Sequence, residues 1–266
     1  MKRSVLDMGM LFDTHVHLNG KPFIEDIENV VKTSQKNGIK KMVCIGYDMQ
    51  SSLLAIDLAY RFPNVIYAAI GIHPNDCNDI SDDDLKRLEA MLDEPCVVAL
   101  GEIGLDYHWD TVKPEVQKEF FIKQIEMAKR KNKPIIIHSR EATKDTYDIL
   151  KQQDISKIGG VMHSYSSSND MAKEFIKLNM MISISGVITF NNARRTKEVA
   201  KDIPLDKLLI ETDCPYLTPV PYRGKTNYPE YTYYVAQEIA SQKDMDIDGV
   251  IEQTYKNACQ FFKIAE

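Results

Sequence analysis

The sequence predicts an α/β fold, a (β/α)8 TIM barrel, from three observations. After residue 10, eight short apolar runs alternate with longer amphipathic stretches. Most runs are apolar throughout, as is typical of parallel strands buried on both faces. The first run is not followed by the glycine-rich loop that a dinucleotide-binding open sheet would carry. The closed barrel is therefore favoured over a doubly wound open sheet, which has the same local rhythm.

The eight apolar runs are the expected strands, because aliphatic and β-branched residues suit a buried, pleated surface. In chain order they span residues 10–18, 40–47, 65–73, 96–104, 133–139, 159–165, 180–186 and 207–215. The stretches between and after them are expected to form eight helices.

Two of these stretches carry clear signals for the start of a helix. Residues 81–94 begin with Ser81, and Asp84 follows three residues later, which predicts a reciprocal capping box. Residues 114–132 begin with Pro114, which suits a first helical turn, and continue with apolar residues at helical spacing.

The composition fits an ordinary globular enzyme. The chain has 266 residues, 44% hydrophobic and 27% charged, and no Gly-, Ser- or Pro-rich linker, so we expect one domain over residues 1–266. A net charge of −6 gives no overall attraction for nucleic acid or anionic membranes, so any phosphate must be bound locally. We expect a monomer that does not bind membranes.

Cysteine usage and the N-terminus favour the cytoplasm. The five cysteines include no CxxC pair, which suits a reducing compartment. Residues 1–10 lack the apolar core of a signal peptide. The longest apolar runs fall far short of the ~20 residues that a membrane span needs.

Five of the six histidines lie at the C-terminal ends of expected strands. His15 and His17 end the first run and, two residues apart, face the same way in a strand. His73, His138 and His163 end the third, fifth and sixth runs. Because these ends meet at the rim where barrel active sites form, we expect the histidines to share one cavity.

Two carboxylates lie at the same rim as the histidines: Glu102 at the end of the fourth run and Asp213 at the end of the eighth. Buried imidazoles and carboxylates are costly to desolvate, and a divalent cation relieves that cost. The expected ligands of such a cation are His15, His17, Glu102, His138, His163 and Asp213. Six ligands exceed the needs of one tetrahedral catalytic site, which favours two ions bridged by Glu102, with a single ion as the alternative.

Two rim residues are candidates for proton transfer. Asp213 is expected to bind metal and also to accept a proton from the attacking water, with ligation alone as the alternative. His73 is expected to donate a hydrogen bond to phosphate or a proton to the leaving group, unless it only packs. Strand alternation also points Glu211 and Asp13 into the barrel. There they either orient neighbouring groups or only stabilise the barrel.

Candidate substrate contacts lie near the same rim. Arg140 follows His138, while Arg223 and Lys225 lie on the loop after the eighth run, where barrels often bind phosphate. A solvated charged loop is the alternative. Base stacking or packing is expected of the nearby aromatic residues Tyr107, His108, Trp109 and Tyr165.

Several longer motifs occur in order along nearly the whole chain. They are FDTHVHL, GIHP, GEIGLDYHW, KPIIIHSREA, GVMHSYS, ISISGVITF, LIETDCPYLTP and PYRGKTNYP. Together they resemble the TatD-related DNase family of metal-dependent hydrolases. Many amidohydrolase-type barrels share His-x-His, whereas the ordered combination is particular to this family.

The resemblance implies one or two divalent ions, held by the six expected ligands, and hydrolysis of nucleic-acid phosphodiesters, often from a 3′ end. Some positions depart from the family pattern. Thr226 and Tyr228 replace an arginine and a glutamate, Asn75 stands where a histidine is common, and Ser167 where glycine is common. These changes bear on substrate preference more than on chemistry.

We therefore expect a metal-dependent deoxyribonuclease, a 3′-5′ exonuclease acting on single strands or 3′ ends of DNA, that uses Mg, Mn or Zn. One alternative is an ester or amide hydrolase such as a D-aminoacyl-tRNA deacylase, because the same activated water can attack a carbonyl. A non-enzymatic, metal-stabilised binding module is the second alternative.

Overall fold

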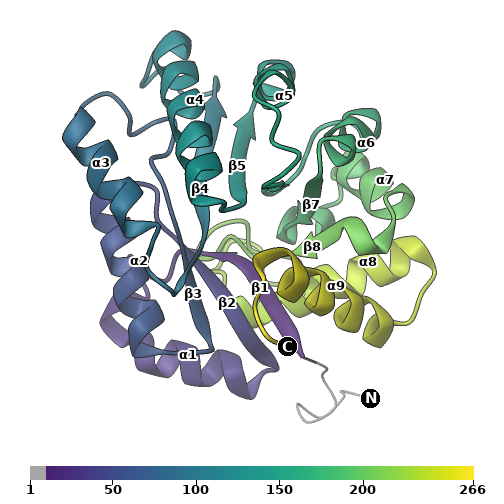
Figure 1. Cartoon of the computed structure of the whole chain (residues 1–266). Helices are drawn as coiled ribbons and strands as arrows, with labels where there is room; N and C mark the ends of the chain where they lie inside the picture. The colour runs from purple at the N-terminus through teal and green to yellow at the C-terminus, as the bar shows by residue number, and fades with distance from the viewer. Residues whose placement is uncertain (1–9) are drawn as a thin grey trace.

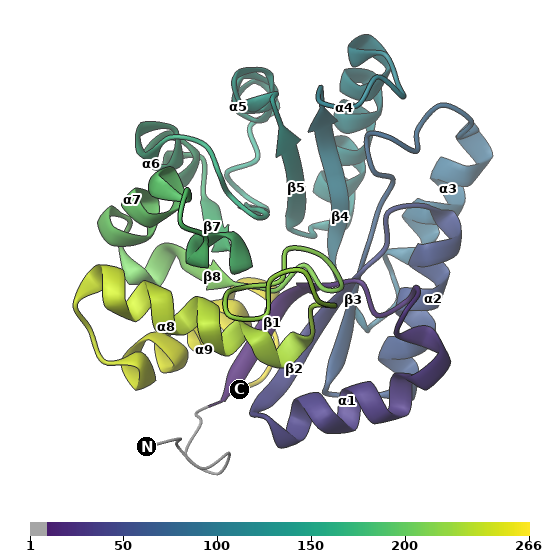
Figure 2. The ribbon, with the colours of Figure 1, turned by 180° about the vertical axis from the view of Figure 1, so that it is seen from behind.

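The structure, a computed structural model, describes residues 10–266 and confirms the predicted barrel. Eight parallel strands pair in chain order, and the helices surround them (Figures 1 and 2). The strands are β1 (Leu11–Val16), β2 (Ile39–Ile45), β3 (Ile66–Ile70), β4 (Val97–Asp106), β5 (Ile135–Arg140), β6 (Gly160–Met162), β7 (Met180–Ile184) and β8 (Leu208–Ile210). The expectation about a signal peptide in residues 1–10 lies almost wholly outside the described residues.

The helices alternate with the strands as the amphipathic stretches predicted. They are α1 (Ile27–Lys36), α2 (Met49–Arg61), α3 (Asp82–Met91), α4 (Pro114–Lys131), α5 (Thr143–Gln152), α6 (Asn169–Lys177), α7 (Arg194–Asp202), α8 (Thr232–Lys243) and α9 (Ile247–Phe262). The predicted capping box of α3 is confirmed: Ser81 Oγ accepts from Asp84 N, and Asp84 Oδ2 accepts from Ser81 N, both at 3.2 Å. As predicted, α4 begins at Pro114.

The prediction of eight helices is wrong, because residues 10–266 form nine α-helices, two of them after β8. The additional helix, α9, supplies Tyr255 and Phe262, whose rings each lie 6.1 Å from that of Phe12 in β1. These residues join a buried cluster that draws on every strand of the barrel. Figure 1 shows α9 lying across β1. The helix is therefore part of the barrel core, which local periodicity alone did not reveal.

The barrel closes between β1 and the segment that follows β8. Asp213 N donates to His15 O at 3.0 Å, and His17 N donates to Cys214 O at 2.9 Å. The buried carboxylate of Asp13 accepts from Thr212 N at 2.9 Å and from Thr212 Oγ1 at 2.6 Å. These bonds place the two histidines of β1 beside Asp213.

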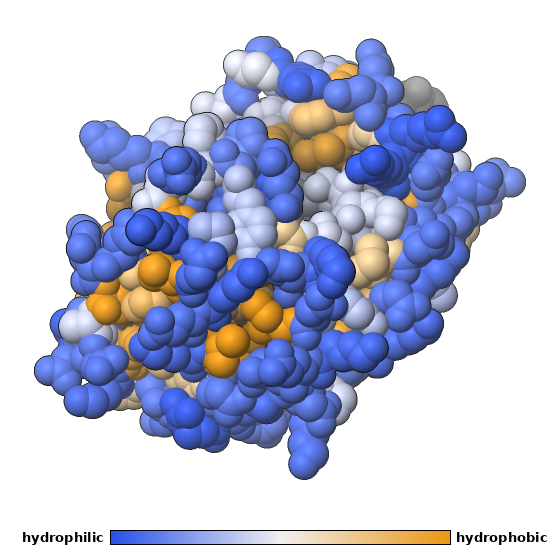
Figure 3. All heavy atoms as spheres, turned by 90° about the horizontal axis from the view of Figure 1, so that it is seen from above, coloured by the Kyte–Doolittle hydropathy of each residue, from blue (hydrophilic) through white to orange (hydrophobic). Residues whose placement is uncertain are grey.

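One face of the molecule is mainly polar. The view from above shows hydrophilic residues over most of this face, with apolar residues in separate patches (Figure 3). Within residues 10–266, no helix combines the length and apolarity that a membrane span requires.

Gly104 permits the close approach of β4 to β5 beside the site. Its φ is +140°, and a Cβ atom built there would lie 2.0 Å from the carbonyl oxygen of His138. A side chain at this position would therefore require both backbone strain and separation of the two strands.

We predict that Gly104→Ala lowers the free energy of unfolding by about 3 kcal/mol, from steric overlap and strain together. Urea unfolding measures this change. Gly249→Ala in α9 is the matched control: its added Cβ would meet nothing within 4 Å. We expect it to stabilise the protein by up to ~1 kcal/mol, because alanine favours helices. Equal midpoints of urea unfolding for the two variants would contradict the conclusion that only glycine fits at position 104.

Candidate metal centre

The barrel brings all six expected ligands together at the carboxyl ends of its strands. At the β1–β8 closure, His15 Nε2 lies 3.2 Å from His17 Nε2 and 3.6 Å from Asp213 Oδ1. His17 Nε2 lies 3.3 Å from the same Asp213 oxygen. The first strand and the segment after the last therefore direct three potential ligand atoms at one point.

Glu102 of β4 connects this group to the other histidines. Its Oε2 lies 3.5 Å from His15 Nε2, and its Oε1 lies 2.8 Å from His138 Nδ1 and 3.8 Å from His163 Nε2. Three overlapping groups could each hold an ion: His15, Glu102 and His163; His15, His17 and Asp213; and His73, Glu102 and His138. Glu102 belongs to two of these groups, and so does His15.

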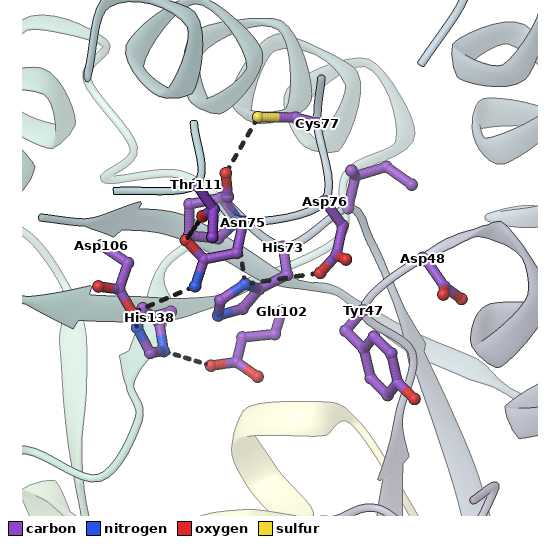
Figure 4. A network of polar contacts seen from close by, with 12 residues as sticks. Tyr47, Asp48, His73, Asn75, Asp76, Cys77, Glu102, Asp106, Thr111 and His138 are labelled. Carbon is purple, nitrogen blue, oxygen red and sulfur yellow. Dashed lines mark hydrogen bonds and ion pairs between the residues drawn. The ribbon is translucent and has the colours of Figure 1, made fainter. Parts of the chain in front are cut away.

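Two further carboxylates hold the outer sides of the histidines. Asp106 Oδ2 lies 2.9 Å from His138 Nε2, and Asn75 Nδ2 donates to the same oxygen at 3.4 Å (Figure 4). Glu211 Oε1 lies 2.7 Å from His163 Nδ1. The orienting role considered for Glu211 fits this position, whereas Asp106 was missed. The sequence did contain a signal for Asp106. It lies two residues after Gly104 and four after Glu102, and alternate residues of a strand face the same side.

The charges in the cluster stabilise one another. Burial opposes ionisation of Glu102, but His163, His138 and His15 hold its pKa well below the usual range. Burial likewise opposes protonation of His163, but Glu211 and Glu102 raise its pKa to about 10. The pKa of His138 is raised to about 9, because the carboxylates of Asp106 and Glu102 outweigh burial.

His73 differs from its neighbours. Burial lowers its pKa to about 4, so the ring is neutral at pH 7. Its Nδ1 accepts the backbone N–H of Asn75 at 3.1 Å, which places the hydrogen of the neutral ring on Nε2. A neutral His73 can donate a hydrogen bond, but it carries no extra proton for a leaving group.

The donor set fits divalent cations. Within the described residues, Nδ1 of His15 and Nδ1 of His17 are buried without a hydrogen-bond partner, so the polar contacts of both rings are at Nε2. Protonated His138 and His163 offset only two of the four negative charges on Glu102, Asp106, Glu211 and Asp213. Metal binding requires neutral imidazoles, so bound divalent cations would replace the protons in neutralising these carboxylates.

The cluster lies in a cavity of about 390 Å³, opening beside Tyr47 and Tyr216. Tyr47 is 36% exposed and Tyr216 is 61% exposed, and both rings pack edge-on against His17, at 5.7 and 6.1 Å. In Figure 4, Tyr47 and Asp76 lie to the right of His73, whereas His138 and Asp106 lie to its left. The sequence analysis missed both tyrosines, although Tyr47 ends the expected second strand.

The substrate contacts expected from sequence are only partly assembled. Tyr165 is 4% exposed, packs against Phe175, and donates its hydroxyl hydrogen to Ser168 O, which leaves little ring surface for a base. The Arg223 guanidinium lies 3.8 Å from the centre of the Phe190 ring. Neither it nor Lys225 lines this cavity. Base stacking by Tyr165 and phosphate contacts from Arg223 and Lys225 in this cavity are therefore not supported by this geometry.

A (β/α)8 barrel with imidazoles and carboxylates gathered at its carboxyl rim defines a class, the metal-dependent hydrolases of barrel fold. The family model for TatD related DNase matches residues 12–263. The chain belongs to this family of metal-dependent hydrolases.

Individual relatives agree with the family assignment. The uncharacterized metal-dependent hydrolase YabD of Bacillus subtilis is 44% identical, with 96% of this chain and 100% of the relative covered. The uncharacterized metal-dependent hydrolase YcfH of Escherichia coli is 36% identical, with 96% of each chain covered. The crystal structure of YJJV, a TatD homologue from Escherichia coli, is similar with a TM-score of 0.91 and 30% identity, covering 96% of this chain and 98% of that one.

We predict that divalent metal binding releases about two protons at pH 7, because His138 and His163, with pKa values of about 9 and about 10, must lose their protons to bind. Apparent affinity should therefore rise with pH up to that range. Calorimetric titration in two buffers of different ionisation enthalpy measures the proton release. Equal heats in both buffers would refute this protonation scheme.

Proposed function

We propose that the protein is a deoxyribonuclease that hydrolyses DNA phosphodiesters on single strands or from 3′ ends. The observation that carries the proposal is the position of the ligand cluster inside an open cavity with two exposed tyrosines. A phosphodiester beside the cluster would leave its nucleobase near Tyr47 and Tyr216. Aromatic rings stack on bases of any sequence, which suits a single-strand substrate. The family description, TatD related DNase, supports the same substrate class.

In this proposal the divalent ions are held by His15, His17, Glu102, His138, His163 and Asp213. When bound, such ions activate water and neutralise charge on the phosphate oxygens. Asp106 and Glu211 orient the rings of His138 and His163 from outside the coordination sphere, as their contacts of 2.9 and 2.7 Å suggest.

The proton path assigns separate roles to Asp213 and His73. Water attacks phosphorus, and the bond from phosphorus to the departing sugar oxygen breaks. The Asp213 carboxylate takes a proton from the attacking water, and the departing oxygen takes a proton from solvent in the open cavity. Burial opposes ionisation of Asp213, but its hydrogen bond with His17 and the nearby His163 lower its pKa. A bound cation would favour the ionised carboxylate in the same direction once His163 is neutral. Neutral His73 donates from Nε2 to a non-bridging oxygen and stabilises charge there.

We predict that Asp213→Asn lowers kcat at least ~100-fold, because the amide preserves the shape but removes the proton acceptor. Metal content, measured by mass spectrometry, must accompany the kinetics. Asp76→Asn is the matched control, since its carboxylate lines the same cavity outside the six expected ligands, and we expect a much smaller loss. Wild-type turnover by a fully metallated Asp213→Asn enzyme would reject the assigned role.

The substrate class is tested by a parallel screen of the protein loaded with Mg²⁺, Mn²⁺ or Zn²⁺. The substrates are a 5′-labelled single-stranded oligonucleotide, the same strand with a blocked 3′ end, and an aminoacyl ester. We expect stepwise shortening of the free strand, slower cleavage of the blocked strand, and no activity after chelation. Ester turnover far above oligonucleotide turnover would overturn the proposal in favour of ester hydrolysis.

A further inference from the structure

A second cavity lies next to the candidate metal centre. It has a volume of about 250 Å³ and is lined by residues at the ends of β5 and β6, the first residue of α5, and Arg195 of α7. His163 lines both this cavity and the one that holds the ligand cluster. A bound chain leaving the metal centre past His163 would therefore reach the second cavity.

The arginines of this cavity differ from most others in the protein. Within residues 10–266 there are seven arginines, of which four form ion pairs with carboxylates: Arg61, Arg87, Arg130 and Arg194. The other three, Arg140, Arg195 and Arg223, form no such pair within that range. Two of these three line the second cavity. Uncompensated arginines in one cavity are the arrangement expected of an anion site.

The other lining groups suit a phosphate. The hydroxyl-bearing Thr143, Ser166 and Ser167 line the cavity and can donate hydrogen bonds. Thr143 begins α5, and Ala142 before it supplies no side-chain cap, so the positive end of this helix adds to the potential there. The lining carboxylate, Glu141, lies 2.8 Å from His108 Nδ1, a contact that draws it toward the imidazole.

We propose that the second cavity binds the backbone phosphate of a neighbouring nucleotide and so positions a single strand across the metal centre. This inference rests on the proposed function and extends it from the reacting phosphodiester to the strand beyond. With a net charge of −6, the protein as a whole repels a polyanion, so strand binding requires such a local cationic site. Arg195, and not the loop carrying Arg223 and Lys225, supplies the contact together with Arg140.

Arg195→Gln tests the proposal, and Arg194→Gln is the matched control. The two residues are adjacent and exposed, but Arg194 pairs with Glu198 at 2.9 Å and does not line the cavity. The metal-loaded protein is titrated with a phosphorothioate decanucleotide that resists hydrolysis. Trp109, the single tryptophan, lies under the Arg140 guanidinium at 5.6 Å and reports binding by its fluorescence.

We expect Arg195→Gln to weaken decanucleotide binding about tenfold, as loss of one charged phosphate contact requires. The slope of log affinity against log salt concentration should become less steep by about 0.7. Arg194→Gln should bind like the wild type. The weakening should be smaller for a dinucleotide, because its single phosphodiester cannot occupy both cavities at once. Unchanged melting temperatures establish that both variants are folded.

The outcomes separate the two proposals. If the wild type shortens oligonucleotides but Arg195→Gln and Arg194→Gln have equal affinity and salt slope, the phosphate site is overturned and the nuclease proposal stands. If the wild type neither binds nor cleaves oligonucleotides but hydrolyses an ester, the proposed function is overturned and the phosphate site with it.

Discussion

Closure of the barrel is the constraint on which the site depends. The backbone bonds between His15, His17 and the Asp213–Cys214 segment, with the Asp13 to Thr212 bonds, join residues about 200 positions apart in sequence. An open sheet would leave β1 and β8 at opposite edges, and the potential ligands of these segments could not converge. The glycine at 104, which brings β4 close to β5, extends the same constraint to Glu102 and His138.

Mutual neutralisation makes so dense a group of buried charges tolerable. Four carboxylates whose ionisation is opposed by burial each face at least one imidazole: Glu102, Asp106, Glu211 and Asp213. His138 and His163, whose pKa values are raised, each have carboxylates on both sides of the ring. The same carboxylates would orient neutral rings toward a metal when the protons leave. His73, which lacks a close carboxylate contact of that kind, stays neutral and is left free to donate a hydrogen bond.

Under the proposed function, the surroundings of the cluster account for how a negatively charged protein would bind a polyanion. Exposed tyrosines border the cavity of the cluster, whereas unpaired arginines gather in the cavity next to it. Stacking surfaces and positive charge are thus separated around the site, in the way that single-strand binding combines ring faces with a cationic track. One further described arginine has no ion pair: Arg223, on the loop after β8. Its guanidinium packs against the ring of Phe190.

The sequence by itself determined the strand order, the α3 capping box at Ser81 and the common location of the six expected ligands. It could do so because apolar periodicity and capping are local properties, and because the ends of parallel strands meet at one rim. Only the tertiary structure decided that Tyr165 is buried, that α9 completes the core and that Arg195 reaches a cavity beside the site. These depend on which distant side chains fill the remaining space, a choice that packing makes and that no local pattern of residues encodes.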